Sequence, residues 1–213
     1  MNDQSSPQQS TFIPEPCFIG KSDAIIEIPI PSSVTDGDIS KSFLVFMSSP
    51  DSVNVTIGAE KESNLQRYDD GLTNNSGEIW RYTQDSVKWF GLTIVPSITC
   101  RIERSGLEDN TISVSVLSAE TKLSGLGIVG RSVSAMVNAA STDGEIVMSW
   151  EEDTAKGVYH LNAKFQLNIH LHSSYAPSGV QSIGSKFVGR TCSSKLKQNL
   201  QKIRDEYISW SNK

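Results

Sequence analysis

The sequence predicts an α+β protein in which a curved antiparallel β-sheet grips one long C-terminal α-helix. Apolar and polar residues alternate repeatedly between Gly77 and Leu171, which is the pattern of strands with one buried face. Near the C-terminus, apolar residues recur instead at the spacing of an amphipathic helix. Strands of this kind cannot bury their apolar face alone, so the terminal helix is the natural element to cover it.

The chain has 213 residues, a length that suits a single domain. Residues 1–20 contain several prolines and few apolar side chains, which predicts a disordered N-terminal arm before one domain at 21–213. Residues 24–30 then alternate like a strand, and Pro29 indicates a sheet edge or a strand end.

A short helix is predicted before Pro50, where apolar residues recur at helical spacing. Its apolar stripe consists of Ile39, Phe43, Phe46 and Met47. Residues 51–72 fit a helix and a strand equally well, because a stretch of alternating residues is followed by helically spaced ones.

The clearest strand is residues 158–171, where an unbroken series of apolar residues alternates with polar ones. Residues 92–104, 112–116 and 145–150 show the same period of two over shorter stretches. Residues 128–140 are less regular and fit either a strand or a short helix. The alternation predicts antiparallel pairing, because parallel strands covered on both faces are apolar throughout.

The C-terminal helix presents an apolar arc of about 80° when successive residues are turned by about 100°. The arc is formed by Cys192, Leu196, Leu200, Ile203, Tyr207 and Trp210. The apolar residues before it fall on a different arc, so we expect a break near Gly184 or Gly189.

Aromatic and glycine placements in two regions resemble a known family. The first region holds Trp80-Arg81-Tyr82, Trp89-Phe90-Gly91-Leu92 and Val95-Pro96, and the second holds Pro177, Gly184 and Asp205-Glu206-Tyr207-Ile208-Ser209-Trp210. Together with the order of elements, they resemble the START-like (SRPBCC) superfamily, whose fold is called helix-grip. Within it, the chain resembles an uncharacterised domain-of-unknown-function family from cyanobacteria and plastids. The resemblance implies a cavity for a hydrophobic ligand and a photosynthetic setting, in the plastid stroma or the cyanobacterial cytoplasm.

Cavities that bind small molecules are mostly apolar and carry a few polar groups. We therefore expect the ligand to contact the inward faces of the strands and the apolar arc of the helix. The predicted ligand-binding residues are Trp80, Tyr82, Ile94, Ile98, Trp150, Phe165, Leu167, Ile169, Leu196, Leu200 and Ile203. An ordinary filled core made of these same side chains is the open alternative, because protein interiors normally pack to crystal density.

No pattern in the sequence predicts a catalytic or a metal site, and no cofactor is expected. His170 and His172 share one strand face, but His160 lies about 33 Å away along the strand, so the pair lacks a third metal ligand.

Two further patterns have ordinary explanations. The acidic clusters at 69–70 and 151–153 fall in expected turns, where charge is solvated. The glycines at 125–130 have dinucleotide-binding spacing but lack the helix and the acidic residue of such a unit.

The net charge of −5 argues against nucleic acid as a partner, but the last helix is basic. Its basic residues are Lys186, Arg190, Lys195, Lys197, Lys202 and Arg204. They predict an anionic membrane surface or an acidic protein as a partner. The alternative is a solvated helix face whose positive charge suits the helix dipole.

The three cysteines, Cys17, Cys100 and Cys192, are odd in number and widely spaced, which predicts a reduced intracellular compartment. The start lacks the basic and apolar regions of a secretory signal, and no apolar run approaches the roughly 18 residues of a spanning helix. The sequence leaves open whether Met1 is the native start or follows a removed transit peptide.

Three functional hypotheses follow. The first is a non-enzymatic carrier or assembly helper that binds an apolar or amphipathic molecule such as a lipid, an isoprenoid or a pigment. The second is a cyclase or hydrolase acting on an apolar substrate, with Tyr82, Arg101 and Glu103 as candidate acid–base groups. The third is a protein-interaction factor that uses the basic helix and the N-terminal arm.

Overall fold

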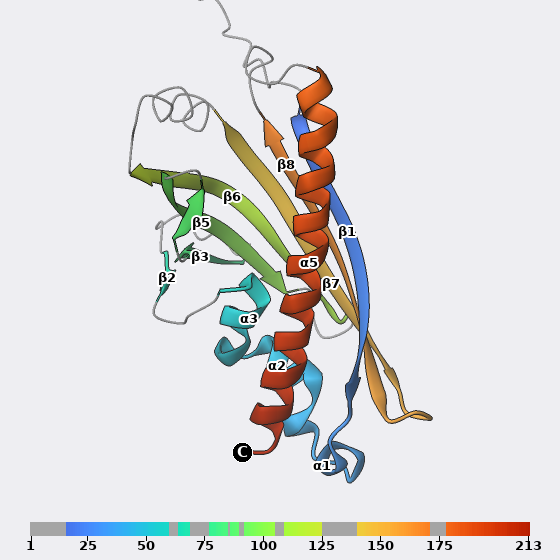
Figure 1. Cartoon of the computed structure of the whole chain (residues 1–213). Coiled ribbons are helices and arrows are strands. Elements are labelled where there is room, and N and C mark those ends of the chain that lie inside the picture. Colours follow the sequence, from blue (N-terminus) through green and yellow to red (C-terminus); the bar gives the residue numbers. More distant parts are fainter. Residues whose placement is uncertain are drawn as a thin grey trace, which may run out of the picture.

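The computed structural model describes residues 16–59, 64–68, 77–84, 86–89, 92–104, 109–124, 140–170 and 178–213. Its strands form one curved sheet, and the long C-terminal helix crosses the inner face of that sheet (Figure 1). The predicted α+β architecture, an antiparallel sheet gripping a C-terminal helix, is thereby confirmed. This is a helix-grip fold.

The described residues contribute eight strands to the sheet. They are β1 (Pro16–Pro29), β2 (Leu65–Arg67), β3 (Glu78–Thr83), β4 (Val87–Trp89), β5 (Leu92–Arg104), β6 (Thr111–Ser124), β7 (Ser141–Asp153) and β8 (Val158–His170). The strand order is β1-β8-β7-β6-β5-β3-β2, and β4 pairs with β5. Every pairing is antiparallel, as the alternation of apolar and polar residues predicts.

Short helices connect β1 to β2. They are α1 (Ser32–Thr35), α2 (Phe43–Ser48) and α3 (Val53–Ile57). The hydroxyl of Ser42 accepts a hydrogen bond from the backbone N–H of Val45 and so caps α2. Gly58 ends α3 with a φ of 76°, which glycine adopts without steric cost. The ambiguous stretch after Pro50 therefore contains a helix first and the short strand β2 later.

The helix predicted before Pro50 is only partly as expected. Phe43, Phe46 and Met47 are buried on one side of α2, as their spacing predicts. Ile39 lies in a separate 3₁₀ turn instead and is 77% exposed. The apolar stripe therefore starts at Phe43.

The C-terminal helix α5 (Ser178–Ser211) runs unbroken over 34 residues, a length of about 51 Å. The expected break near Gly184 or Gly189 is therefore wrong. The helix packs chiefly along β1, and at Gly184 the ring of Phe18 occupies the space that a side chain would need. Gly184 thus permits close packing between helix and strand.

None of the helices in the described part of the chain is long and apolar enough to span a membrane.

Two glycines of α5 provide a matched test of this packing. Alanine is favoured over glycine in a helix by up to about 1 kcal/mol at either position. A Cβ atom at Gly189 would meet no described atom within 4 Å, so Gly189→Ala should raise the free energy of unfolding by about 0.5–1 kcal/mol. A Cβ atom at Gly184 would collide with Phe18, so Gly184→Ala should lower that free energy by about 1–3 kcal/mol. Urea denaturation measures both changes, and equal stabilisation by both variants would contradict the close packing.

Strand β1 begins at Pro16, within the segment 1–20 that the sequence predicts to be a disordered arm. Residues 16–20 pair with the far end of β8 and belong to the sheet. Residues 1–15 lie outside the described residues.

Candidate functional site

A cavity of about 380 Å³ lies between the sheet and the middle of α5. Its volume is near the lower end of the range for small-molecule sites. Such a space suits one ring system or one short chain. Its walls differ in chemistry, and that difference determines what the cavity can bind.

The sheet side of the cavity is apolar apart from Gln84, which follows β3. Five strands provide the wall, which consists of Tyr82, Ile98, Cys100, Val114, Val116, Ile146, Phe165 and Leu167. The strand register brings these side chains together, because residues paired across antiparallel strands lie on the same face. Tyr82, for example, pairs with Ile98, and Ile146 pairs with Phe165.

The helix side is largely polar. It consists of Thr191, Cys192, Lys195, Leu196, Gln198, Asn199 and Lys202 of α5, with Ile57 and Gly58 from the end of α3. At about 100° per residue, its polar members lie on one flank of the helix, beside the apolar arc. A ligand with an apolar body and one polar edge therefore matches both walls.

A cluster of aromatic rings fills the interior beside the C-terminal end of α5. The ring of Phe43 lies 5.3 Å from that of Trp150, 5.5 Å from that of Tyr159 and 5.1 Å from that of Tyr207, measured between centroids. The hydroxyl of Tyr207 donates a hydrogen bond to the backbone oxygen of Lys41, which fixes the cluster to the segment before α2. The interior is therefore packed at this end and hollow beside residues 191–202.

The structure divides the predicted ligand-binding residues into two groups. Those that line the cavity are Tyr82, Ile98, Phe165, Leu167 and Leu196. Those that do not are Trp80, Trp150, Ile169, Leu200 and Ile203, while the side chain of Ile94 lies outside the described residues. Contact of the first group with a ligand stays a prediction.

The residues away from the cavity have identifiable surroundings. Trp150, Leu200 and Ile203 are buried in the hydrophobic core. Trp80 is partly buried, and its indole N–H donates to a carboxylate oxygen of Glu78 at 3.1 Å. Ile169 pairs with Phe18 near the end of β8, beyond the cavity.

Asn199 is a cavity residue that sequence reasoning missed. The residue is buried, with 9% of its surface exposed, and its Oδ1 atom has no hydrogen-bond partner among the described residues. Its amide lies over Gly58, whose missing side chain leaves room for it. The signal that could have found Asn199 is its place at the edge of the apolar helix arc, directly before Leu200.

Two thiols lie in the cavity wall. Burial raises the pKa of Cys100 to about 12 and also raises the pKa of Cys192. Both are therefore protonated at neutral pH and behave as small apolar groups. They contribute shape to the cavity and no charge.

The acid–base candidates Tyr82, Arg101 and Glu103 are not brought together. Tyr82 lines the cavity and accepts a hydrogen bond from the side-chain amide of Gln84. Arg101 and Glu103 alternate with the buried Cys100 and Ile102, so they lie on the opposite face of β5. There they approach each other at 3.9 Å between Nη1 and Oε1.

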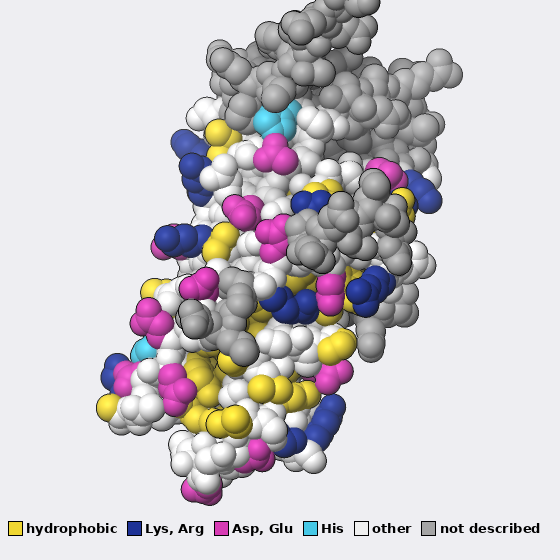
Figure 2. Space-filling view, turned by 180° about the vertical axis from the view of Figure 1, so that it is seen from behind, with side chains coloured by type: hydrophobic (Ala, Val, Ile, Leu, Met, Phe, Trp, Pro, Cys, Tyr) yellow, Lys and Arg dark blue, Asp and Glu magenta, His cyan; other side chains and the backbone are white. Residues whose placement is uncertain are grey.

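His160 and His170 lie on the outer face of the sheet, because they alternate with the inward residues of β8. Charged side chains of both signs are scattered over this face (Figure 2). Both rings have carboxylate partners: His160 is 3.4 Å from Asp153, measured from Nε2 to Oδ2, and His170 is bonded to Asp143. Burial alone raises the pKa of Asp143, but the hydrogen bonds from Asn168 and His170 outweigh it and lower that pKa.

Among the described residues, no three His, Cys, Asp or Glu side chains lie close enough together to hold a metal ion. His172, the acidic pair at 69–70 and the glycines at 125–130 lie outside the described residues. The acidic cluster at 151–153 ends β7, where the Asp153 carboxylate accepts from the backbone N–H of Lys156.

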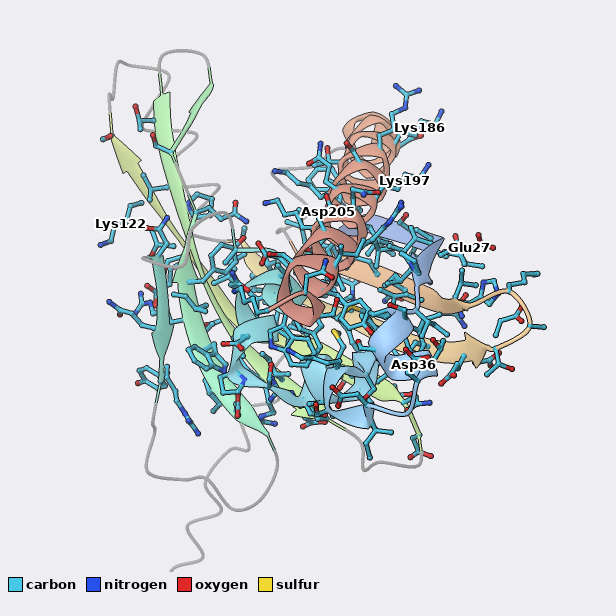
Figure 3. The ribbon with its side chains drawn as sticks, turned by 90° about the horizontal axis from the view of Figure 1, so that it is seen from below. Glu27, Asp36, Lys122, Lys186, Lys197 and Asp205 are labelled. Atoms are coloured by element: carbon cyan, nitrogen blue, oxygen red, sulfur yellow. The ribbon has the colours of Figure 1, made fainter. Side chains whose placement is uncertain are left out.

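The basic residues of α5 lie on two flanks of the helix. Lys186 and Lys197 project from the side of α5 away from β5 and β6 (Figure 3). Lys195 and Lys202 lie on the other flank and line the cavity. The predicted single basic face is therefore divided, and only part of it meets the cavity.

These features define a helix-grip protein with a small amphipathic cavity. No protein-family model matches the chain, and no curated protein matches it. Membership of the cyanobacterial and plastid family therefore stays a prediction.

Several solved structures show a limited similarity to this chain. The major latex-like protein 151 of Panax ginseng has a TM-score of 0.44 at 9% identity, covering 89% of this chain and 98% of its own. Truncated norcoclaurine synthase from Thalictrum flavum has a TM-score of 0.45 at 11% identity, covering 89% of this chain and 93% of its own. An uncharacterized Rhizobium leguminosarum protein has a TM-score of 0.39 at 11% identity, covering 88% and 96%. Likeness at this level carries no information about ligand or reaction.

Proposed function

We propose that this protein binds a small amphipathic molecule in the cavity between its sheet and α5, as a carrier or an assembly helper. The observation that carries the proposal is the contrast between the walls. The sheet wall is apolar, and the facing flank of α5 carries amide, hydroxyl and ammonium groups. Binding sites typically combine an apolar lining with a few polar groups that orient the ligand.

The size of the cavity narrows the ligand class. A space of about 380 Å³ holds one ring system or one short chain and cannot enclose a lipid with two long chains. Among the predicted ligands, a short isoprenoid or a fragment of a pigment therefore fits better than a membrane phospholipid.

A filled cavity tests the proposal directly. Val116 lines the cavity, whereas its neighbour Leu117 does not and is 44% exposed. Val116→Trp should weaken binding of the fluorescent probe 8-anilinonaphthalene-1-sulfonate by tenfold or more, because the indole occupies the space that the probe needs. Leu117→Trp adds the same group at an exposed position and should leave the affinity unchanged. Equal affinities in both variants and the parent protein would show that the probe binds elsewhere.

The natural ligand can be sought in the protein purified from its source. Native mass spectrometry should show a mass above that of the chain, and organic extraction should release a small molecule with an apolar body. Protein that carries nothing, together with a Val116→Trp variant that binds the probe normally, would overturn the proposal.

The proposals for the cellular location and for the partner of the exposed basic residues of α5 come from the sequence alone. We propose the plastid stroma or the cyanobacterial cytoplasm as the location, and a fluorescent fusion of the full chain tests it. An anionic membrane surface or an acidic protein remains the predicted partner of the exposed basic residues, and the flank with Lys186 and Lys197 is the part of α5 that would face it.

A further inference from the structure

Two lysines belong to the polar wall of the cavity. Lys195 and Lys202 line it from α5, and both residues are exposed. Because they are seven residues apart, they lie about 10 Å apart along the helix and within about 20° of each other around it. Thr191 and Gln198 line the cavity from the same flank. The flank therefore brings two positive charges and two neutral hydrogen-bonding groups to the rim of one cavity.

No acidic side chain balances this charge at the cavity. Among the described residues that line it, none is an aspartate or a glutamate. The next acids along α5 are Asp205 and Glu206, and in the described part of the chain neither forms an ion pair with Lys202. The Asp205 carboxylate instead accepts a hydrogen bond from the side-chain amide of Gln201 at 2.9 Å. The rim is thus locally positive in a chain whose net charge is −5.

The place of the two lysines determines which end of a ligand they would meet. A lysine covers apolar surface with its methylene stem while its ammonium group stays in water. A ligand whose body lies on the apolar sheet wall would therefore present its polar head to the ammonium groups at the rim. Hydrogen bonds to an ionised head are roughly twice as strong as those to a neutral one. A cationic head would be repelled there.

We infer that the ligand is an amphipathic organic anion, whose apolar body lies in the cavity and whose anionic head is held at the rim by Lys195 and Lys202. This inference rests on the proposed function and adds the charge of the ligand to it. Lysine acts as a compact point charge without the fixed planar geometry of arginine, so the selection is for negative charge and not for one head-group shape.

The test compares two probes of the same size that differ in charge. 2-Naphthoate carries a carboxylate where 2-naphthamide carries a neutral carboxamide, and the carboxylate is ionised at about pH 7.5. Both are measured by displacement of the uncharged fluorescent probe N-phenyl-1-naphthylamine. The quantity of interest is the ratio of their dissociation constants, because the shared bicyclic body cancels in it.

The variants remove positive charge while keeping a polar side chain. The preference for 2-naphthoate should fall by about threefold in Lys202→Gln and by about tenfold when Lys195→Gln is added. The matched control combines Lys186→Gln and Lys197→Gln, which remove the same charge from the other flank of α5 (Figure 3). This control should keep the ratio of the parent protein, because salt screens charges at that distance.

The outcomes separate this inference from the proposed function. A ratio that is unchanged in the cavity variants, or that falls equally in the control, overturns the role of the two lysines and leaves the cavity as a binding site. A parent protein that binds 2-naphthamide but not 2-naphthoate does the same. If the double variant fails to fold, Lys202→Gln alone decides between these results. Failure of the parent protein to bind any of the three probes overturns the proposed function and this inference together.

Discussion

Replacing Phe43 with alanine should lower the free energy of unfolding by about 3–5 kcal/mol, a large share of the stability of a domain. Phe43 is fully buried, and its ring contacts the rings of Trp150, Tyr159 and Tyr207. Removing the ring deletes these contacts and leaves a cavity that the sheet on one side and α5 on the other cannot close. The expected cost therefore combines lost burial with a cavity term.

Equilibrium unfolding in urea measures this change, with Val45→Ala as the matched control. Val45 belongs to the same short helix but is 41% exposed, so its truncation should change stability by no more than about 0.5 kcal/mol. Phe43→Leu keeps most of the volume and should cost less than Phe43→Ala. A loss below about 1 kcal/mol in Phe43→Ala would mean that the aromatic cluster does not anchor α2 to the core.

The sheet could be predicted from sequence because each strand carries its own signal. Residues 158–170 alternate strictly, and the structure buries Tyr159, Leu161 and Ala163 on one side of β8. The unbroken course of α5 could not be predicted in the same way. Glycine normally weakens a helix, and only the ring of Phe18, distant in sequence, shows why Gly184 is tolerated there.

The cavity was predictable only in part. Trp150, Leu200 and Ile203 lie on inward faces, so their burial followed from periodicity. Whether they face a ligand or a packed core depends on α2 and α3, short helices that fill one end of the interior. Nothing in local sequence gives the position of these helices relative to α5, because tertiary contacts determine it. Asn199 was missed for a related reason: an amide beside an apolar arc is significant only when its partners are known.

Stability should fall steeply at alkaline pH because four buried acids hold their protons more tightly in the folded protein. Burial raises the pKa values of Cys100, Cys192, Tyr159 and Tyr207. In the unfolded chain these groups lose their protons near their ordinary pKa values, which are about 8.5 for cysteine and about 10 for tyrosine. Above those values the unfolded state binds fewer protons than the folded state, so the free energy of unfolding falls as pH rises. Their contribution is fully present below about pH 8 and is lost through the alkaline range.

Cys100 provides the sharpest measurement of this effect, since its pKa is raised to about 12 and its side chain is 1% exposed. Between pH 9 and 11 it should contribute a slope of about −1.4 kcal/mol per pH unit, or about 3 kcal/mol in all. Urea denaturation at several pH values between about 9 and 11 measures this effect. In Cys100→Ala, the free energy of unfolding should fall less steeply with pH, by about 1.4 kcal/mol per pH unit. If Cys100→Ala and the parent protein lose stability in parallel, the thiol is reached by solvent in the folded state. In that case the cavity wall at β5 is open to water, and the dry apolar wall on which ligand binding depends is absent.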